Sequence, residues 1–131
     1  MKISKSIIVA IFAISLGLFG FVAKQEVDYA EFVKKHATYW GLKGTQCGDY
    51  TPDSYTVVLK NTSKDLLDIK IAVQEKSKKW RCFNHESVAF NDTIIGYACT
   101  GNGKYLKWVK KAGDRTTVFP TDQEVNDQYA K

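Results

Sequence analysis

The residues that could support catalysis or metal binding are few, and their spacing suits neither task. Cys82 and His85 form a single Cys-x-x-His spacing, whereas zinc sites combine ligands from two such pairs. His36 stands beside Lys35, where a solvated histidine is the ordinary explanation. The aspartates fall mostly in turn-rich stretches, where an Asp side chain bonds the backbone two residues on. We therefore predict no catalytic residue, no metal site and no cofactor. We expect the chain not to be an enzyme, with a small hydrolase as the least favoured alternative.

Aromatic and basic residues occur together in two stretches, and this is the pattern that most favours binding. Residues 78–81 read Lys-Lys-Trp-Arg, and residues 104–111 read Lys-Tyr-Leu-Lys-Trp-Val-Lys-Lys. Aromatic faces flanked by cations can stack on sugars or attract anionic partners. In the alternative interpretation, the tryptophans fill the core and the lysines protect sheet edges against aggregation. We predict a binding surface made by Trp80, Arg81, Tyr105, Lys107 and Trp108.

The number of cysteines limits the disulfides that the chain can form. There are three: Cys47, Cys82 and Cys99. Three thiols allow at most one intramolecular pair. Cys82 and Cys99 each lie in a strand-like stretch, two positions from an apolar residue, so that the cysteine and the apolar residue would share one face of the strand. We therefore predict a Cys82–Cys99 disulfide if the compartment is oxidising. The alternative is three small buried residues with no disulfide.

The N-terminal segment indicates export. Lys2 and Lys5 precede an uncharged apolar run of 17 residues, 7–23. A positive start followed by an apolar stretch is typical of a secretory signal or a membrane anchor. The run is long for a signal core and at the lower limit for a bilayer span, so cleavage after Ala23 and a retained tether are both open. We expect a protein that is periplasmic or secreted, or membrane-anchored and facing outside the cytoplasm.

The part of the chain beyond the apolar run carries a mild positive charge. Residues 24–131 hold 17 basic and 14 acidic residues, a net charge of +3. This balance suits attraction to an anionic surface, but it is also ordinary for a soluble exported domain. We expect no nucleic-acid partner, because an exported protein is separated from nucleic acid.

The hydrophobic period changes along the exported part. Apolar residues three and four apart predict a helix over residues 24–40. From residue 50 the period is two, and short strand-like stretches recur at about ten-residue intervals, which is typical of an antiparallel sandwich or a small barrel. Gly101-Asn102-Gly103 predicts a hairpin turn between strands at 93–100 and 104–111. Thr121 and Glu124 form a capping box that predicts a C-terminal helix.

These patterns give a mainly β fold with one compact domain. We predict a signal peptide or anchor over residues 1–23, a helical lead-in over 24–44, and a small antiparallel β-sandwich with a C-terminal helix over 45–131. The alternating strands resemble those of immunoglobulin-like sandwiches, and a barrel-like closure is the other possibility; neither likeness implies an activity. Residues 61–63 and 91–93 also match the N-glycosylation acceptor pattern, although turns explain them equally well.

The function that we expect is that of an exported, non-catalytic binding or accessory module of the bacterial cell envelope. It would contact an envelope protein or a glycan through the basic and aromatic surface. The alternative is an inhibitor or immunity-type protein that blocks an envelope-active enzyme. Tight one-to-one binding to a single enzyme would favour this alternative, whereas weak, salt-sensitive binding would favour a glycan partner.

Overall fold

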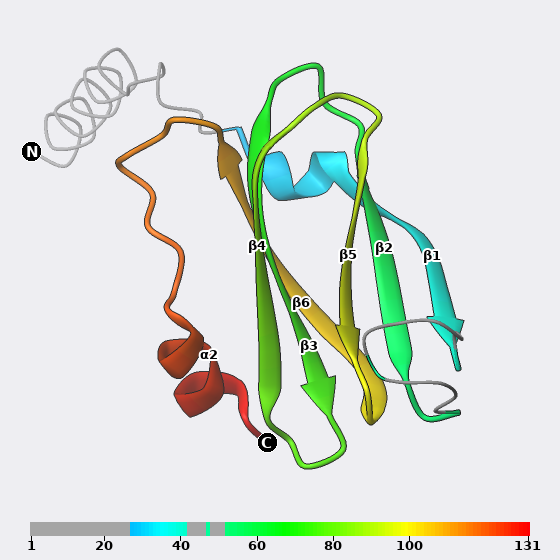
Figure 1. Ribbon diagram of the computed structural model, residues 1–131. Coiled ribbons are helices and arrows are strands. Elements are labelled where there is room, and N and C mark those ends of the chain that lie inside the picture. The colour runs from blue at the N-terminus through cyan, green and yellow to red at the C-terminus, as the bar shows by residue number, and fades with distance from the viewer. Residues whose placement is uncertain (1–26, 42–46, 48–51) are drawn as a thin grey trace, which may run out of the picture.

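The computed structural model describes residues 27–41, residue 47 and residues 52–131. In this part, six strands form two antiparallel sheets of three strands each (Figure 1). One sheet has the order β1-β2-β5, with β1 (Val33–Trp40), β2 (Tyr55–Asn61) and β5 (Thr93–Ala98). The other has the order β4-β3-β6, with β3 (Leu67–Glu75), β4 (Trp80–Val88) and β6 (Gly101–Lys111). A 3-10 turn, η2 (Tyr29–Phe32), precedes β1, and α2 (Asp122–Tyr129) follows the last strand. The prediction of a mainly β, sandwich-like fold is confirmed.

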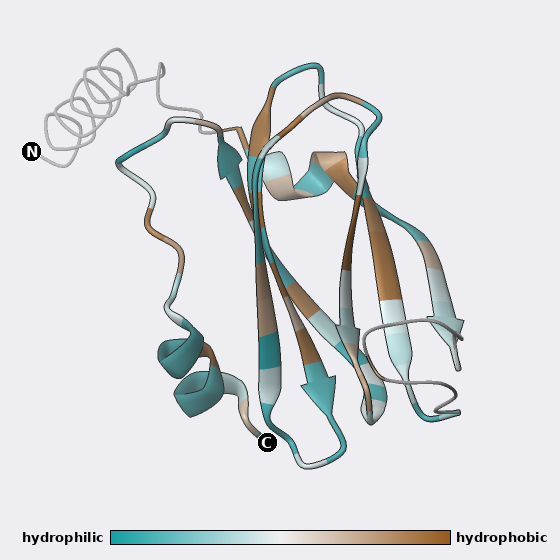
Figure 2. Cartoon of the chain, viewed as in Figure 1, coloured by the Kyte–Doolittle hydropathy of each residue, from teal (hydrophilic) through white to brown (hydrophobic). Residues whose placement is uncertain are grey.

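The two sheets enclose one apolar core, to which alternate residues of each strand contribute. Val57 and Leu59 of β2 are fully buried, as is Ile71 of β3. Figure 2 shows hydrophobic segments along β2 and β3 and a mostly hydrophilic α2. Gly96 of β5 allows the sheets to approach closely, because a Cβ atom there would lie 2.8 Å from Cγ2 of Ile71. Because side chains alternate along a strand, the buried residues also define which side chains face outward.

The helix predicted over residues 24–40 is wrong where the structure describes it. Only η2 is helical, and the Asp28 carboxylate caps it by accepting a hydrogen bond of 3.1 Å from the Ala30 N–H. Residues 33–40 form β1, which pairs with β2. In a regular strand, residues seven positions apart would point to opposite faces. A bulge between Lys35 and Ala37 shifts the register, so that Val33 and Trp40 both lie opposite buried residues of β2. Seven residues are also two turns of an α-helix, so the spacing fits both structures.

The hairpin predicted at residues 101–103 is also wrong. The chain turns at residues 99 and 100, and Gly101 already belongs to β6. β5 pairs with β2 and β6 pairs with β3, so the two strands lie in different sheets. Residues 116–119 form no strand.

The C-terminal helix is confirmed together with its capping box. Thr121 Oγ1 accepts a hydrogen bond from the Glu124 N–H (3.1 Å), and the Glu124 carboxylate accepts one from the Thr121 N–H (3.0 Å). Val125 is fully buried against Trp80 on the outer side of the β4-β3-β6 sheet. The Lys70 ammonium fixes the start of the helix by donating to the Asp122 carboxylate (2.6 Å). α2 therefore covers the outer face of this sheet.

The N-terminal apolar run and the acceptor pattern at 61–63 differ in what the structure shows of them. The signal or anchor predicted at 7–23, with its cleavage point after Ala23, lies outside the described residues. Within the described ranges, no helix has the length and apolar character needed to cross a bilayer. The acceptor pattern at 61–63 has a structural role, because the buried Asn61 side chain donates from Nδ2 to the carbonyls of Asp65 (3.0 Å) and Val88 (2.9 Å).

Candidate functional site

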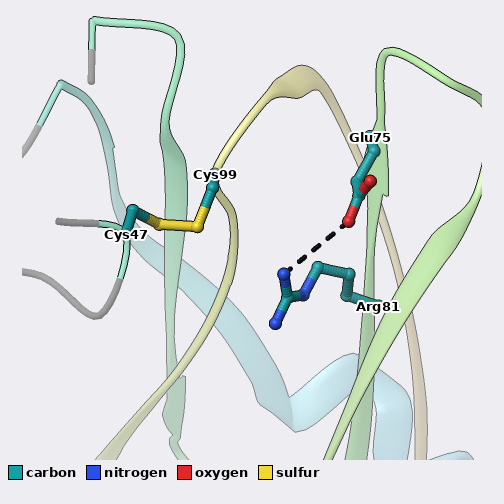
Figure 3. The surroundings of a disulfide bond; sticks show 4 residues. All are labelled: Cys47, Glu75, Arg81 and Cys99. Carbon is teal, nitrogen blue, oxygen red and sulfur yellow. Dashed lines mark ion pairs between the residues drawn. A yellow bond between two sulfur atoms is a disulfide. The ribbon is translucent and has the colours of Figure 1, made fainter.

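The disulfide joins Cys47 to Cys99, and the predicted Cys82–Cys99 pair is wrong (Figure 3). Cys99 lies in the turn after β5, whereas Cys82 lies in the middle of β4, opposite Ala72 on the face that α2 covers. In each strand the cysteine alternates in step with apolar residues, which indicated that its side chain is covered. The pattern does not distinguish cover on the inner face of one sheet from cover on the outer face of the other. A disulfide is compatible with an oxidising location outside the cytoplasm.

Cys82 is a free thiol held in an unreactive state. Burial, and to a smaller extent the nearby Asp122 carboxylate, raise its pKa to about 11 against the smaller opposing effect of Lys70. Only the thiolate reacts with alkylating agents. We expect iodoacetamide to modify Cys82 in the native protein at pH 8 roughly a hundredfold more slowly than in urea, where the pKa returns to its ordinary value. Equal rates in the two states, followed by intact mass, would contradict this description.

The structure places Trp80 and Trp108 beneath α2. Trp80 is 6% exposed, its indole N–H donates to the Tyr129 carbonyl (3.0 Å), and its backbone N–H donates to Asn126 Oδ1 (2.7 Å). The Trp108 ring contacts the Tyr129 ring edge-on, with centroids 6.0 Å apart. Both indoles thus contact the protein's own helix, with Trp80 buried and Trp108 half-buried, as the core-filling interpretation expects.

Arg81, Tyr105 and Lys107 lie at register positions of opposite parity to the tryptophans. Arg81 pairs with Glu75 (3.7 Å; Figure 3) and stacks on the Tyr97 ring. Tyr105 packs against the core between the sheets, and the Lys107 ammonium donates to the carbonyl of Val33 in β1. The sheet therefore divides the five predicted binding residues between its two faces, and most of their binding groups already contact the protein itself.

A groove of about 490 Å³ beside α2 includes two of the predicted residues, Trp80 and Tyr105. Gln74, which also lines it, donates from Nε2 to the carbonyl of Lys78 (3.0 Å) and accepts at Oε1 from Asn102 (2.7 Å). Both amide atoms are therefore already hydrogen-bonded. The Gln74 amide is therefore not available to a ligand, and the other polar side chains that line the groove are those of Lys104, Tyr105, Tyr129 and Lys131.

The Cys82 and His85 side chains do not form a pair. Cys82 lies opposite Ala72, on the side covered by α2, whereas His85 lies opposite the buried Ile69 and its Nε2 is 3.0 Å from the Ile95 carbonyl oxygen. Over the described ranges, no three His, Cys, Asp or Glu side chains come close enough to hold a metal ion.

The outer side of the β1-β2-β5 sheet differs from that of the other sheet, because no described helix or strand covers it. In Figure 1, α2 and the segment leading to it lie on the β4 side, away from β1 and β2. The register aligns Ala37, Val58 and Ile95 in one row across the three strands, and Tyr39, Thr56 and Tyr97 in the next. We call these six residues the open face; within it, Thr56 in the centre of the second row is buried (5% exposed).

Apolar groups of the open face are exposed. Ile95 is 48% exposed and Tyr39 is 45% exposed, while Val58 between their strands is half-buried. Tyr97, at the β5 end of its row, contacts the Phe83 ring with centroids 5.0 Å apart and is stacked on by Arg81. A contiguous apolar patch on a sheet marks an interaction site more often than single exposed apolar residues do.

All ionic charge on this sheet is positive. The described strands β1, β2 and β5 contain Lys34, Lys35 and Lys60 and no aspartate or glutamate. Lys34 and Lys60 face each other across β1 and β2, in the row next to that of Ala37 and Val58. None of the ion pairs in the described part of the chain involves these three lysines. The open face is therefore an apolar patch with an uncompensated positive margin.

Comparison of the chain with protein-family models, with curated proteins and with solved structures finds no significant match in any of the three. Function must therefore be argued from the geometry alone.

The open face was missed at the level of the sequence because its residues come from three separate segments. Ala37 and Tyr39 fall in the stretch predicted to be helical, and Ile95 was assigned only to a strand. One signal was present: segments 33–40, 55–61 and 93–98 contain no acidic residue. That signal becomes informative only when the pairing of the strands is known.

Proposed function

We propose that this chain is an exported, non-catalytic binding module of the cell envelope that holds an acidic protein partner on the open face. The observation that carries the proposal is the contrast between the two sheets. α2 covers the outer face of one sheet, whereas the other exposes Ile95 and Tyr39 next to a margin of unpaired lysines. An apolar centre with a charged margin is the usual composition of a protein interface. The margin favours a partner with negative charge.

A protein partner fits these observations better than a glycan does. Sugar binding by stacking requires exposed aromatic faces, and Trp80 and Trp108 pack against α2. Trp40 is 54% exposed, but its ring packs against the Tyr55 ring, with centroids 4.8 Å apart. The exposed apolar groups of the open face are Ile95 and Tyr39, and another apolar protein surface desolvates such side chains effectively. A partner enzyme that loses activity on binding would assign the inhibitor role, and a partner without activity would assign a structural role.

The proposal is tested with Ile95→Asp, which places a negative charge in the apolar centre. Tagged full-length protein is cross-linked in its native envelopes, and the captured proteins are identified and quantified. We expect Ile95→Asp to reduce capture of the main acidic partner about tenfold or more, because a buried unpaired carboxylate is costly and repels the partner's own charge. Val118→Asp is the matched control, since Val118 is apolar and 83% exposed but lies between β6 and α2.

Both variants must unfold within a few degrees of the natural protein before capture is compared. Equal capture by the natural protein and by Ile95→Asp would reject the open face as the binding site. Recovery of polysaccharide in place of a protein would reject the assignment of the partner.

A further inference from the structure

The side of the molecule next to the open face carries an unpaired strand edge. β1 is the outermost strand of its sheet, and within the described ranges it pairs only with β2. Seven of its eight residues are at least partly exposed. A free strand edge presents N–H and C=O groups that can pair with another strand.

The direction of these groups follows from the register. Gly41 N–H donates to the Ser54 carbonyl (2.9 Å), and Thr62 N–H donates to the Phe32 carbonyl (2.8 Å). In an antiparallel pair, alternate residues bond to the neighbouring strand and the others point away from it. Phe32 lies before the bulge and Gly41 after it, and both bond to the β2 side. Counting alternate residues from each of them shows that Lys35 and Thr38 direct their backbone groups away from β2. The Val33 carbonyl points the same way, and Lys107 of β6 donates to it.

The charges beside the edge are mainly positive. Lys34, Lys35 and His36 follow one another and are all exposed. Lys107 is close to them: burial lowers its pKa, and the charge of Lys34 lowers it further, against the smaller opposing effect of Asp28. Because the Asp28 carboxylate offsets these two cations only in part, a further acidic group would stabilise the site.

A second copy of this chain is a poor occupant of the edge. Pairing of β1 with β1 of another molecule would bring Lys34, Lys35 and His36 close to their own counterparts, and like charges across a strand pair are destabilising. An extended segment rich in Asp and Glu has the opposite charge and can satisfy the outward backbone groups at the same time. Strand addition of this kind obtains affinity from main-chain hydrogen bonds and specificity from alternate side chains.

We propose that the free edge of β1, at residues 35–40, takes up an extended acidic segment of the protein partner as a fourth strand of the β1-β2-β5 sheet. This inference rests on the proposed function, since the added strand continues the open face outward from Ala37 and Tyr39.

The test uses the full-length protein and a ten-residue peptide in which Glu alternates with Val and Thr. Backbone amide shifts and hydrogen exchange are followed by NMR during titration. We expect protection of the Lys35 and Thr38 amides. Thr38→Pro removes an outward N–H that an edge strand does not need for its own sheet, and it should weaken peptide binding about tenfold. Thr38→Ala, which keeps the N–H, should bind within about twofold of the natural protein.

A second pair of variants tests whether peptide binding requires the positive charge of β1. This pair still tests the proposal if Thr38→Pro fails to fold. Replacing Lys34 and Lys35 with Glu should abolish detectable binding of the peptide, because attraction becomes repulsion. Lys79→Glu, in the turn between β3 and β4, should leave binding unchanged. A peptide in which Lys replaces every Glu should not bind.

Three results would overturn the strand proposal: no binding of the acidic peptide at millimolar concentration, equal binding by Thr38→Pro and the natural protein, or shifts without amide protection that dextran sulfate reproduces. The last result would mean simple polyanion binding. Capture of the partner separates the two proposals. If Ile95→Asp prevents capture and folded Thr38→Pro does not, strand addition fails while the open face stands. If neither variant affects capture, the open face fails as well.

Discussion

Removal of the Cys47–Cys99 disulfide is expected to lower the free energy of unfolding by about 4 kcal/mol. The two cysteines are 52 positions apart, so the bond closes a long loop in the unfolded chain and restricts it strongly. Part of the effect also comes from the folded state, because the bond ties Cys47 to the turn between β5 and β6. The measurement is urea unfolding of the Cys47→Ser, Cys99→Ser double variant, compared with the natural protein.

Cys82→Ser is the matched control for the loss of a sulfur atom. Cys82 is half-buried and outside the disulfide, so we expect a change of about 1 kcal/mol. A double variant as stable as this control would show that the disulfide contributes little. Reduction of the natural protein should reproduce the double variant if no other bond is affected.

Replacement of Asn61 by Ala is expected to cost about 3 kcal/mol. The Asn61 side chain is fully buried at the end of β2 and makes three hydrogen bonds: Nδ2 donates to the carbonyls of Asp65 and Val88, and Oδ1 accepts from the Ser63 N–H (2.7 Å). Loss of the amide leaves these backbone groups without partners in a place that water reaches poorly, and each such group costs about 1 kcal/mol or more.

The effect of Asn61→Ala is measured by urea unfolding, with Asn84→Ala as the control. Asn84 is exposed in the middle of β4, and we expect its replacement to change stability by no more than about 0.5 kcal/mol. If Asn61→Ala were equally mild, the turn between β2 and β3 would not depend on the buried amide.

The parts of the fold that depend on local chemistry could be predicted from the sequence. Thr121 and Glu124 are three residues apart and bond each other's backbone, so the capping box is visible without any tertiary information. The sequence of the strand at 67–75 alternates because Leu67, Ile69, Ile71 and Val73 face the core, even though α2 also covers part of its other face. β1 could not be predicted in the same way, since it is exposed at most positions and therefore lacks an alternating apolar pattern. Its bulge also places Val33 and Trp40, seven positions apart, on the same face, which a regular strand would not do.

The pairing of strands and cysteines was not accessible from local patterns. Gly101 and Gly103 indicated a hairpin, but Gly103 adopts its positive φ of 85° inside β6, where its missing side chain leaves room for the Trp40 ring. Cys99 pairs with the distant Cys47 because the chain turns there to enter the other sheet. The predicted binding residues failed to form one surface for a related reason. Trp80 and Arg81 are adjacent in sequence, and adjacent residues of a strand point to opposite faces.

The most direct test of the open face is site-specific photo-crosslinking from position 95. A photoreactive phenylalanine analogue, p-benzoylphenylalanine, is incorporated in place of Ile95 in the full-length protein, and in place of Val118 in a control. Both proteins are irradiated in native envelopes. We predict one discrete adduct with an acidic protein from position 95 and none from position 118. Adducts of equal yield from both positions, or from position 118 alone, would contradict the assignment of the open face as the partner-binding surface.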